Sequence, residues 1–366
     1  MKDLMLYYHV PFCVSKCAYC AFYSTPQWDE PLLDSYTEAL IRQTEGFEGS
    51  ENFSVTSVYF GGGTPTVLGA LRLCRVLEAV KRRFKLKDGA EITLEANPKT
   101  VTYDDLRILR EAGFNRLSLG AQSFNDRTLK LLNRPHTADD FVACFKNAKL
   151  AGFNNVSADL IFALPDEDED ALSYSVSRLI ELKPKHISVY GLSIEEGTPL
   201  FRDKEKYAFP AEDGEERQYY TLCKLLRDSG YSHYEISNFA LDGYESKHNS
   251  GYWKRVPYFG FGAGAHSFFR NRRFETPRDV TAYTEKTKLG FLAPTDFENA
   301  EEISDSEARE EEIMLSLRLK EGAPIALDKV PSVIFETGCG IYENGRLSLT
   351  EKGFRVSNAI IGMLTC

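Results

Sequence analysis

Three cysteines near the start of the chain have the spacing of a ligand set rather than of a disulfide framework. Cys13, Cys17 and Cys20 lie four and three positions apart in the stretch YYHVPFCVSKCAYCAFYS, residues 7–24. An odd number of thiols cannot pair completely, and a closed structural zinc site takes four protein ligands. Three thiolates suit an iron–sulfur cluster in which one iron is left open to a small molecule.

Three other interpretations of these cysteines carry less weight. A catalytic zinc site could leave its fourth position to water. Cys17 and Cys20 alone would form a redox pair, which leaves Cys13 unexplained. Buried structural thiols are disfavoured because Pro11 and Ser15 indicate a loop, and loops rarely hide three thiols. The five other cysteines are scattered singly, as in proteins of a reducing compartment, which predicts a cytoplasmic protein.

Residues that could help to hold a ligand follow the predicted strands. The segment GGGTPT, residues 61–66, comes directly after the second strand, where glycines let backbone groups approach a ligand closely. Glu95 stands at the end of the third strand, Gln122 follows the fourth and Asp159 lies within the fifth. Because the carboxyl ends of parallel strands meet at one rim, we expect these residues to share a site.

The elements that must position these residues alternate between strand and helix through about residue 200. Crossover helices imply parallel strands, so the pattern predicts an α/β fold. An open doubly wound sheet fits the alternation too, but polar residues recurring at many strand ends favour an incomplete (β/α)6 barrel. The predicted strands span 4–10, 54–60, 91–96, 116–120, 155–163 and 186–192, and the predicted helices span 33–47, 70–84, 102–114, 139–153 and 169–183.

The pattern changes beyond residue 200. A helix is predicted over 212–230, then loops and short strands in an aromatic, glycine-rich region over 231–269, and a further helix over 310–322. The last 22 residues predict a short strand, a turn and a final helix. We therefore predict three parts: a partial barrel over 1–200, an α+β extension over 201–294 and a small helical, winged-helix-like appendage over 295–366.

Composition excludes some classes of function. The formal net charge is −10, much of it in the stretch 296–312, so the chain lacks the general basic surface of a non-specific nucleic-acid-binding protein. No apolar run approaches the roughly 20 residues of a membrane span, and the N-terminus lacks a signal-peptide pattern. We expect no nucleic-acid partner and no membrane anchor.

The spacing CxxxCxxC after a first strand resembles the hallmark of the radical S-adenosylmethionine superfamily. The elements GGGTPT, LEANP, GAQSF, LNRPH and VYGLSIEEGTPL stand in the order found in oxygen-independent coproporphyrinogen III oxidase and its relatives. The resemblance implies a [4Fe–4S] cluster on Cys13, Cys17 and Cys20, with S-adenosylmethionine on the open iron and an electron donor as a partner. It also implies further S-adenosylmethionine contacts from Tyr7, Tyr19, Gly62, Gly63, Thr64, Glu95, Gln122, Arg134 and Asp159.

Two features separate the chain from the true oxidase. The oxidase carries a fourth cysteine two places after the third, where this sequence has Phe22. The segment HNSGYW, residues 248–253, resembles the HNxxYW element of the heme chaperone family HemW, and a histidine flanked by Tyr252 and Trp253 suits heme. His248 is thus a candidate heme contact, with His266 a weaker one; taken alone, a histidine such as His248 is more often a hydrogen-bonding loop residue.

The resemblance implies a heme chaperone that transfers heme to acceptor proteins such as respiratory cytochromes. The alternative is a radical enzyme that acts on a tetrapyrrole by decarboxylation, heme methylation or ring opening. A third possibility is a zinc-binding regulatory protein. The sequence leaves open whether S-adenosylmethionine is cleaved and whether the protein is an enzyme.

Overall fold

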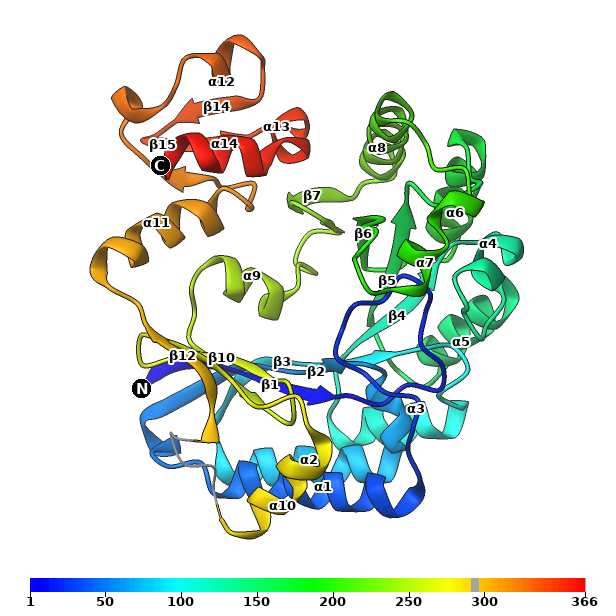
Figure 1. Ribbon diagram of the computed structural model, residues 1–366, viewed down its shortest axis with the longest axis vertical. Helices are drawn as coiled ribbons and strands as arrows, with labels where there is room; N and C mark the ends of the chain where they lie inside the picture. Colours follow the sequence, from blue (N-terminus) through cyan, green and yellow to red (C-terminus); the bar gives the residue numbers. More distant parts are fainter. Residues whose placement is uncertain (291–295, 366) are drawn as a thin grey trace.

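The computed structural model describes residues 1–290 and 296–365, which contain a large mixed sheet and a smaller C-terminal unit (Figure 1). Six strand–helix units build the first part, as predicted. Their strands are β1 (Lys2–Val10), β2 (Phe53–Gly62), β3 (Leu86–Ala96), β4 (Arg116–Gln122), β5 (Asn155–Phe162) and β6 (His186–Gly191), paired in parallel in chain order. The helices that follow them are α1 (Glu30–Glu45), α2 (Ala70–Arg83), α3 (Tyr103–Ala112), α5 (Ala138–Leu150), α6 (Glu169–Glu181) and α8 (Glu212–Asp228).

Local sequence explains where the helices begin and end. Thr102 and Asp105 form a reciprocal capping box at the start of α3, and Gly113 closes that helix with a φ of 112°. Thr137 and Asp140 form the same box at the start of α5. A short helix that the periodicity did not predict, α4 (Asp126–Leu131), lies between β4 and α5 because Asn125 caps its first turn.

The sheet extends beyond the six predicted strands. Its order is β12-β11-β10-β9-β1-β2-β3-β4-β5-β6-β8-β7. The added strands come from the aromatic region and the acidic stretch, and β9 runs parallel to β1 while the others pair antiparallel. They are β7 (Ser232–Glu235), β8 (Asn238–Ala240), β9 (Tyr258–Phe261), β10 (His266–Phe269), β11 (Arg272–Glu275) and β12 (Glu298–Glu302). With β12 and β7 at separate edges the barrel is open, as expected for the incomplete form.

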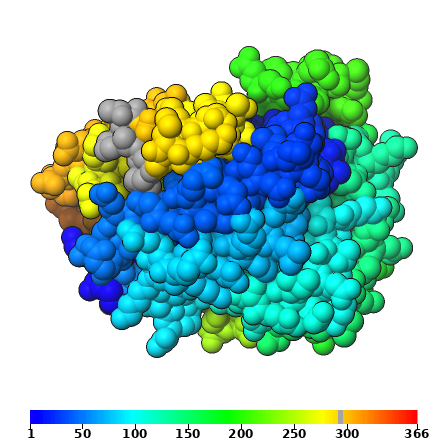
Figure 2. Space-filling model, turned by 90° about the horizontal axis from the view of Figure 1, so that it is seen from below, coloured from blue at the N-terminus to red at the C-terminus, as the bar shows by residue number. Residues whose placement is uncertain are grey.

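The two faces of the sheet differ in polarity. Alternate side chains such as Tyr8 and Phe60 point outward and pack under the helices in the main apolar core. On the outer surface α1 contacts both α2 and α10 (Val280–Lys288), and α3 and α5 continue the layer of helices beyond α2 (Figure 2). The inner face carries Tyr59 and Glu95, and a further short helix, α9 (Lys247–Trp253), lies against it.

The C-terminal unit has its own apolar core, which includes Leu317, Leu347 and Phe354. The helix predicted over 310–322 instead begins at Asp305, where Ser304 and Glu307 form a capping box, and ends at Ser316. The predicted final strand and helix are confirmed. The unit contains α11 (Asp305–Ser316), β13 (Ala323–Pro324), α12 (Val333–Glu336), β14 (Gly340–Glu343), β15 (Arg346–Leu349), α13 (Glu351–Arg355) and α14 (Ser357–Leu364). The predicted boundary at 200 stays a prediction, and the one at 294 lies outside the residues that the structure describes.

Among the residues that the structure describes, no helix combines the length and apolarity that crossing a membrane requires.

Candidate functional site

The three cysteines lie on the loop that leaves the carboxyl end of β1. Backbone hydrogen bonds hold the base of this loop, from Thr25 N to Pro11 O at 2.7 Å and from Cys13 N to Thr25 O at 3.0 Å. The indole of Trp28 donates to the Cys13 carbonyl oxygen at 2.9 Å. All three thiols are free of disulfides. The loop therefore presents its sulfur atoms from a fixed base.

Two donors point at the sulfur atoms, one from Thr64, just after β2, and one from Arg134, which follows α4 in the connection between β4 and α5. Arg134 Nη1 donates to Cys17 Sγ at 3.4 Å, and Thr64 Oγ1 to Cys13 Sγ at 3.7 Å. Burial raises the pKa of Cys13 and Cys20, so a metal must displace their protons. Within the described part of the chain, the buried Nε of Arg134 has no hydrogen-bond partner. Free thiols, directed donors and an unused guanidinium nitrogen fit an iron–sulfur cluster with an adjacent ligand.

The glycine-rich segment packs directly against the cysteine loop. Gly62 has a φ of 116°, and a Cβ there would lie 2.8 Å from the His9 ring. A Cβ on Gly63 would lie 2.7 Å from the Phe12 carbonyl oxygen and 3.0 Å from Cys13 Sγ. Only glycine allows so close an approach of the two loops. These contacts bring the glycine-rich segment and the cysteine loop together at the carboxyl ends of β1 and β2.

Asn97 joins the residues that the sequence singled out separately. Its Nδ2 donates to Thr64 Oγ1 at 2.9 Å, and its Oδ1 accepts from Arg134 Nη2 at 2.5 Å. Arg134 also donates to the Gly120 carbonyl oxygen at 3.2 Å. Asn97 was not among the predicted contacts, although its place in LEANP, just past the third strand, was a signal that could have found it.

Two partly buried carboxyl groups lie beneath this rim. Glu95 accepts a hydrogen bond from the Tyr59 hydroxyl at 2.6 Å, and burial raises the Glu95 pKa to about 7. Asp159 accepts from Ser118 Oγ at 3.2 Å, and burial raises its pKa as well. Carboxyl groups in this state can accept hydrogen bonds from a cationic ligand, which would favour their ionised form.

The remaining predicted contacts surround the same rim. Tyr7 on β1 stacks near Tyr59, with ring centroids 6.2 Å apart, and its hydroxyl is 3.1 Å from His9 Nδ1. Gln122 ends β4 with a φ of 66°, an uncommon conformation for a residue other than glycine. Tyr19 packs with the small apolar cluster around Leu132.

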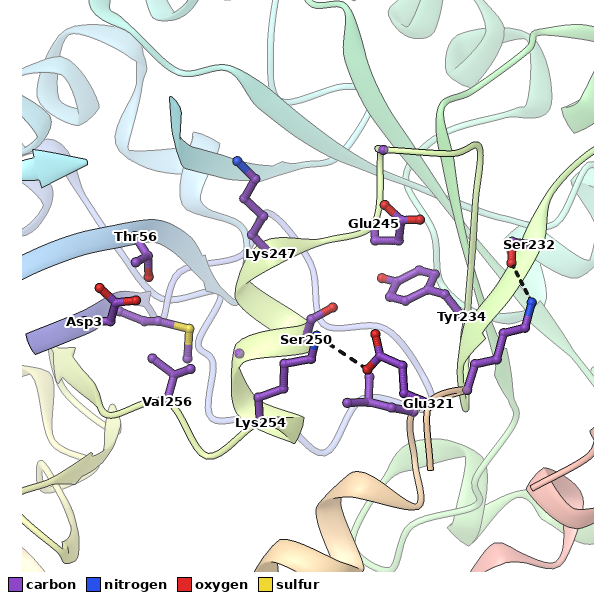
Figure 3. A pocket seen from close by; sticks show the side chains of 15 residues that line it. Asp3, Thr56, Ser232, Tyr234, Glu245, Lys247, Ser250, Lys254, Val256 and Glu321 are labelled. Carbon is purple, nitrogen blue, oxygen red and sulfur yellow. Dashed lines mark hydrogen bonds and ion pairs between the residues drawn. The ribbon is translucent and has the colours of Figure 1, made fainter. Parts of the chain in front are cut away.

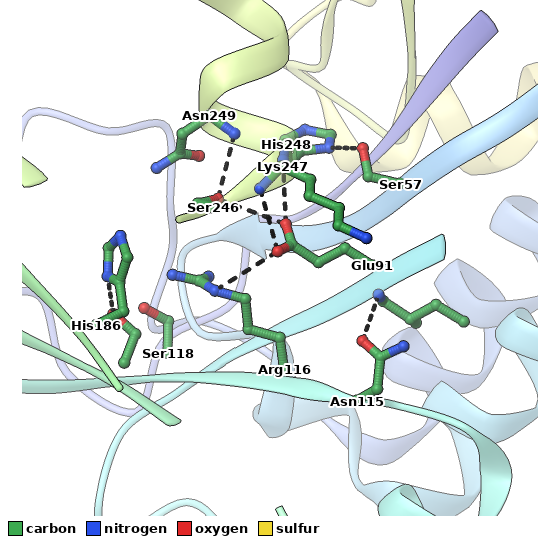
Figure 4. Close-up of polar contacts among 12 residues, drawn as sticks. Ser57, Glu91, Asn115, Arg116, Ser118, His186, Ser246, Lys247, His248 and Asn249 are labelled. Carbon is green, nitrogen blue, oxygen red and sulfur yellow. Dashed lines mark hydrogen bonds and ion pairs between the residues drawn. The ribbon is translucent and has the colours of Figure 1, made fainter. Parts of the chain in front are cut away.

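His248 lies on α9 and is bonded inside the partial barrel (Figure 4). It is 1% exposed. Its Nδ1 is 2.8 Å from Ser57 Oγ, its Nε2 is 2.9 Å from the Tyr252 hydroxyl, and its ring stacks on Tyr59 at 4.9 Å. Burial lowers its pKa to about 3, so the ring is neutral. Because both nitrogens are engaged, binding of iron by His248 would require one of these bonds to break.

Glu91 holds the start of α9. It accepts the backbone N–H groups of Lys247 and His248, at 3.1 and 3.0 Å, and lies 3.9 Å from the buried Arg116 (Figure 4). Trp253, at the other end of α9, donates to Glu235 at 2.8 Å. The whole HNSGYW segment is thereby fixed across the inner face of the sheet. The weaker candidate, His266, is exposed and pairs with Glu275 at 3.1 Å.

The other side of α9 borders a hollow of about 810 Å³ near the amino ends of β1 and β2 (Figure 3). Lys247 and Ser250 of α9, and Lys254 directly after it, line the hollow and face Tyr234 and Glu321. Lys254 pairs with Glu321 at 3.5 Å. The volume is in the range of small-molecule and cofactor pockets, about 300–1,000 Å³. The hollow lies near the amino ends of β1 and β2, whereas the cysteine loop leaves the carboxyl end of β1, so the two are at opposite ends of the strands.

Comparisons with known proteins agree with this geometry. Residues 7–179 match the model of the radical SAM superfamily. The chain is 34% identical to heme chaperone HemW of Lactococcus lactis, across 98% of this chain and 96% of the relative, and 35% identical to heme chaperone HemW of Bacillus subtilis, across 95% and 91%. Coproporphyrinogen III oxidase (HemN) from Escherichia coli has the same fold, with a TM-score of 0.85 at 21% identity, covering 100% of this chain and 90% of that one. From its fold, its site and these relatives, the chain belongs to the heme chaperone HemW family within the radical SAM superfamily.

Proposed function

We propose that this protein is a cytoplasmic heme chaperone that carries a [4Fe–4S] cluster on Cys13, Cys17 and Cys20 and binds S-adenosylmethionine beside it. The arrangement that supports this proposal is the cysteine loop with Arg134 and Thr64 directed at its sulfur atoms. When bound, the cluster and S-adenosylmethionine would supply one-electron chemistry. An electron donor is then a required partner.

The residues of the rim would have separate tasks toward S-adenosylmethionine. Glu95 and Asp159 would accept hydrogen bonds from its cationic and hydroxyl groups, and Arg134 would bind a carboxylate through its unpartnered nitrogen. Glycine at 62 and 63 leaves backbone groups accessible. We assign the remaining contacts to Tyr7, Tyr19, Thr64 and Gln122.

We place heme at α9, at the other end of the strands. HNSGYW forms this helix, and its outer side borders the hollow of about 810 Å³. Lys247 and Lys254 lie there as cationic partners for the carboxylate groups of heme. His248 would then support the helix unless heme binding opens its bonds to Ser57 and Tyr252. Bound heme would pass to acceptor proteins such as respiratory cytochromes.

The substitution at Phe22 favours transfer over decarboxylation. Phe22 stands where the oxidase has its fourth cysteine, and its side chain is 70% exposed. It contributes no thiol to the site. The net charge of −10 also offers no general surface for nucleic acid.

The proposal is tested by anaerobic reconstitution of the cluster followed by incubation with a reductant, S-adenosylmethionine and either heme or coproporphyrinogen III. We expect heme to bind, to remain chemically unchanged and to move to an acceptor apocytochrome. Protoporphyrinogen formation or altered heme over many turnovers would overturn the chaperone assignment and favour the tetrapyrrole enzyme.

The role of His248 is tested separately with His248→Ala. If the ring supports α9, heme should bind more weakly but with the wild-type absorption and electron paramagnetic resonance spectra. A change in the spectroscopic signature of the iron would instead identify His248 as a ligand. Thr281→Ala, on α10 at the outer surface, is a control for general effects of substitution.

A further inference from the structure

A second set of metal-binding side chains lies away from the cysteine loop. Cys223 on α8, His233 on β7 and Glu351 at the start of α13 bring one ligand atom each to within 4.8 Å of one another. We call these three residues the α8–β7–α13 cluster. They come from helix α8, from the edge strand β7 and from the C-terminal unit, and no local sequence pattern predicts that they meet, since they are separated by 10 and 118 residues.

The histidine of this cluster has a nitrogen available for a metal. His233 Nε2 lies 3.4 Å from the Ile236 carbonyl oxygen, which is an acceptor and so places the proton on Nε2. Nδ1 then carries the lone pair. It is shielded from solvent and has no hydrogen-bond partner among the described residues. Metal-binding histidines characteristically donate their other N–H to a carbonyl or carboxylate in this way.

Packing fixes the orientation of that ring. His233 stacks on Phe239, with centroids 4.1 Å apart, and contacts Phe354 at 5.0 Å. Phe239 belongs to the main core and Phe354 to the core of the C-terminal unit. Burial lowers the pKa of His233 to about 4, so the ring is neutral at pH 7, as a metal ligand must be.

The other two side chains supply the charge that a divalent cation needs. Cys223 is fully buried, and burial raises its pKa to about 12, so without a metal it is a thiol. Glu351 forms an ion pair with Arg227 at 2.5 Å and lies on the solvent-accessible side of the cluster. One thiolate and one carboxylate would neutralise a divalent ion, and the neutral imidazole completes a set of three ligands.

We propose that the α8–β7–α13 cluster binds one Zn²⁺. Thiolate, imidazole and carboxylate together are a zinc donor set, with water in the fourth position. Tetrahedral zinc would hold these ligand atoms about 3.4–3.6 Å apart, so a contraction of at most about 1.4 Å from the 4.8 Å limit of the cluster suffices. Binding replaces the Cys223 S–H bond by an S–Zn bond and releases one proton to solvent, with no change of oxidation state. The ion would join the C-terminal unit to the edge of the main sheet.

The experiment measures zinc affinity in the full-length chain with Cys13, Cys17 and Cys20 replaced by alanine, because those thiols would compete for zinc. Zinc competition against a chromophoric chelator gives the affinity, and Co²⁺ substitution reports thiolate coordination in a tetrahedral field. The variants are Cys223→Ser, His233→Asn and Glu351→Gln. Cys144→Ser is the matched control, since burial raises the pKa of that thiol to about 12 as well.

We expect one zinc ion to bind per chain. Each ligand substitution should reduce the zinc affinity by more than about 100-fold, because the loss of a hydrogen bond that only supports a ligand typically reduces it by about 10- to 100-fold. Cys144→Ser should leave the affinity unchanged. Affinity should rise about tenfold per pH unit between pH 6 and 8, because one thiol proton is released. Equal affinity in all variants, or no tight zinc in the parent chain, would overturn the proposal.

Two further measurements keep the test decisive if Cys223→Ser fails to fold. The Glu351 side chain is partly exposed, so the Glu351→Gln variant should fold, and its zinc affinity should be lower than that of the parent chain. Arg227→Gln removes the ion pair that competes with zinc for Glu351, so this variant should not bind zinc more weakly. The second measurement is the zinc stoichiometry of the wild type loaded with its iron–sulfur cluster, in which iron occupies Cys13, Cys17 and Cys20. This protein should still bind one zinc ion per chain. Zinc binding that is lost with Arg227→Gln as much as with Glu351→Gln would contradict direct ligation.

Discussion

The two ends of the partial barrel use similar polar residues but differ in what those residues bind. At the amino end, Glu91 and His248 hydrogen-bond to α9 and its neighbours, and Arg116 lies 3.9 Å from Glu91, although its Nε has no hydrogen-bond partner among the described residues. At the carboxyl end, free thiols face Arg134, whose Nε has no partner among the described residues. Because an unpartnered guanidinium nitrogen occurs at both ends, the three free thiols are what distinguishes the carboxyl end as a ligand set. The comparison separates a structural network from a binding site.

Tyr59 connects the two ends. Its hydroxyl donates to Glu95 at the carboxyl end, and its ring stacks on His248 at the amino end. A ligand that displaces Glu95 would therefore act on α9 through one side chain. This contact offers a direct physical route between the proposed S-adenosylmethionine and heme sites.

The largest effect is expected from Cys17→Ala, which removes one of the three thiols at the carboxyl end. We expect loss of essentially all cluster iron, because an iron of the cluster would lose its protein ligand. The free energy of unfolding and heme binding at α9 should change little, which iron and sulfide analysis, circular dichroism and heme titration would show. Loss of heme binding together with the cluster would contradict the separation of the two ends.

Glu91→Gln should break the network at the amino end. Arg116 is 1% exposed and would lose its 3.9 Å carboxylate partner, and α9 would lose a charged acceptor for its first N–H groups. Leaving a buried charge uncompensated lowers the free energy of unfolding by about 3–5 kcal/mol, measurable by urea denaturation. The exposed Glu310→Gln is the control, with an expected change below about 0.5 kcal/mol. A similar small change in Glu91→Gln would refute a structural role.

The pH dependence of the free energy of unfolding should report on one glutamate at each end of the partial barrel, Glu95 and Glu235. Burial raises the pKa of Glu95 and of Glu235 from 4.5 to about 7. Each group holds its proton more tightly in the folded protein, so its stabilising effect is full below pH 4.5 and is lost as the pH rises toward 7. The free energy of unfolding should fall by up to about 1.4 kcal/mol per pH unit for each group. Glu95→Gln and Glu235→Gln should each remove one of these slopes.

Addition of S-adenosylmethionine should separate the contributions of Glu95 and Glu235 to the pH dependence of the free energy of unfolding. The positive charge of this ligand should lower the pKa of Glu95 and leave Glu235 unaffected. Adding it to the cluster-loaded wild type should therefore reduce the slope to that of Glu95→Gln and no further. A loss of both slopes on binding would show that the ligand reaches the α9 end as well. The measurement is the free energy of unfolding in urea between pH 5 and 7.

Phe22→Ala should have the smallest effect. The side chain is 70% exposed, so the free energy of unfolding should change by less than about 0.5 kcal/mol. Cluster iron should also be unchanged, since Phe22 carries no ligand atom. Denaturation and iron analysis test both. A loss of iron in this variant would mean that Phe22 shields the cluster at the carboxyl end.

Sequence alone determined the features that depend on local pattern. The cysteine spacing, the glycine segment and the strand–helix alternation are each readable within a few tens of residues, and they predicted the rim and the incomplete (β/α)6 barrel. Helix boundaries were less well predicted, because the caps at Asn125 and Ser304 were missed.

Tertiary structure decided what depends on contacts between distant residues. Ser57 and His248 are 191 positions apart, so no local pattern could indicate that both nitrogens of His248 would be occupied. Asn97 reaches Thr64 across 33 positions and Arg134 across 37. The same holds for the α8–β7–α13 cluster. Such contacts arise only when the chain packs, because hydrogen bonds between strands and loops are set by the approach of surfaces and not by the period of the sequence.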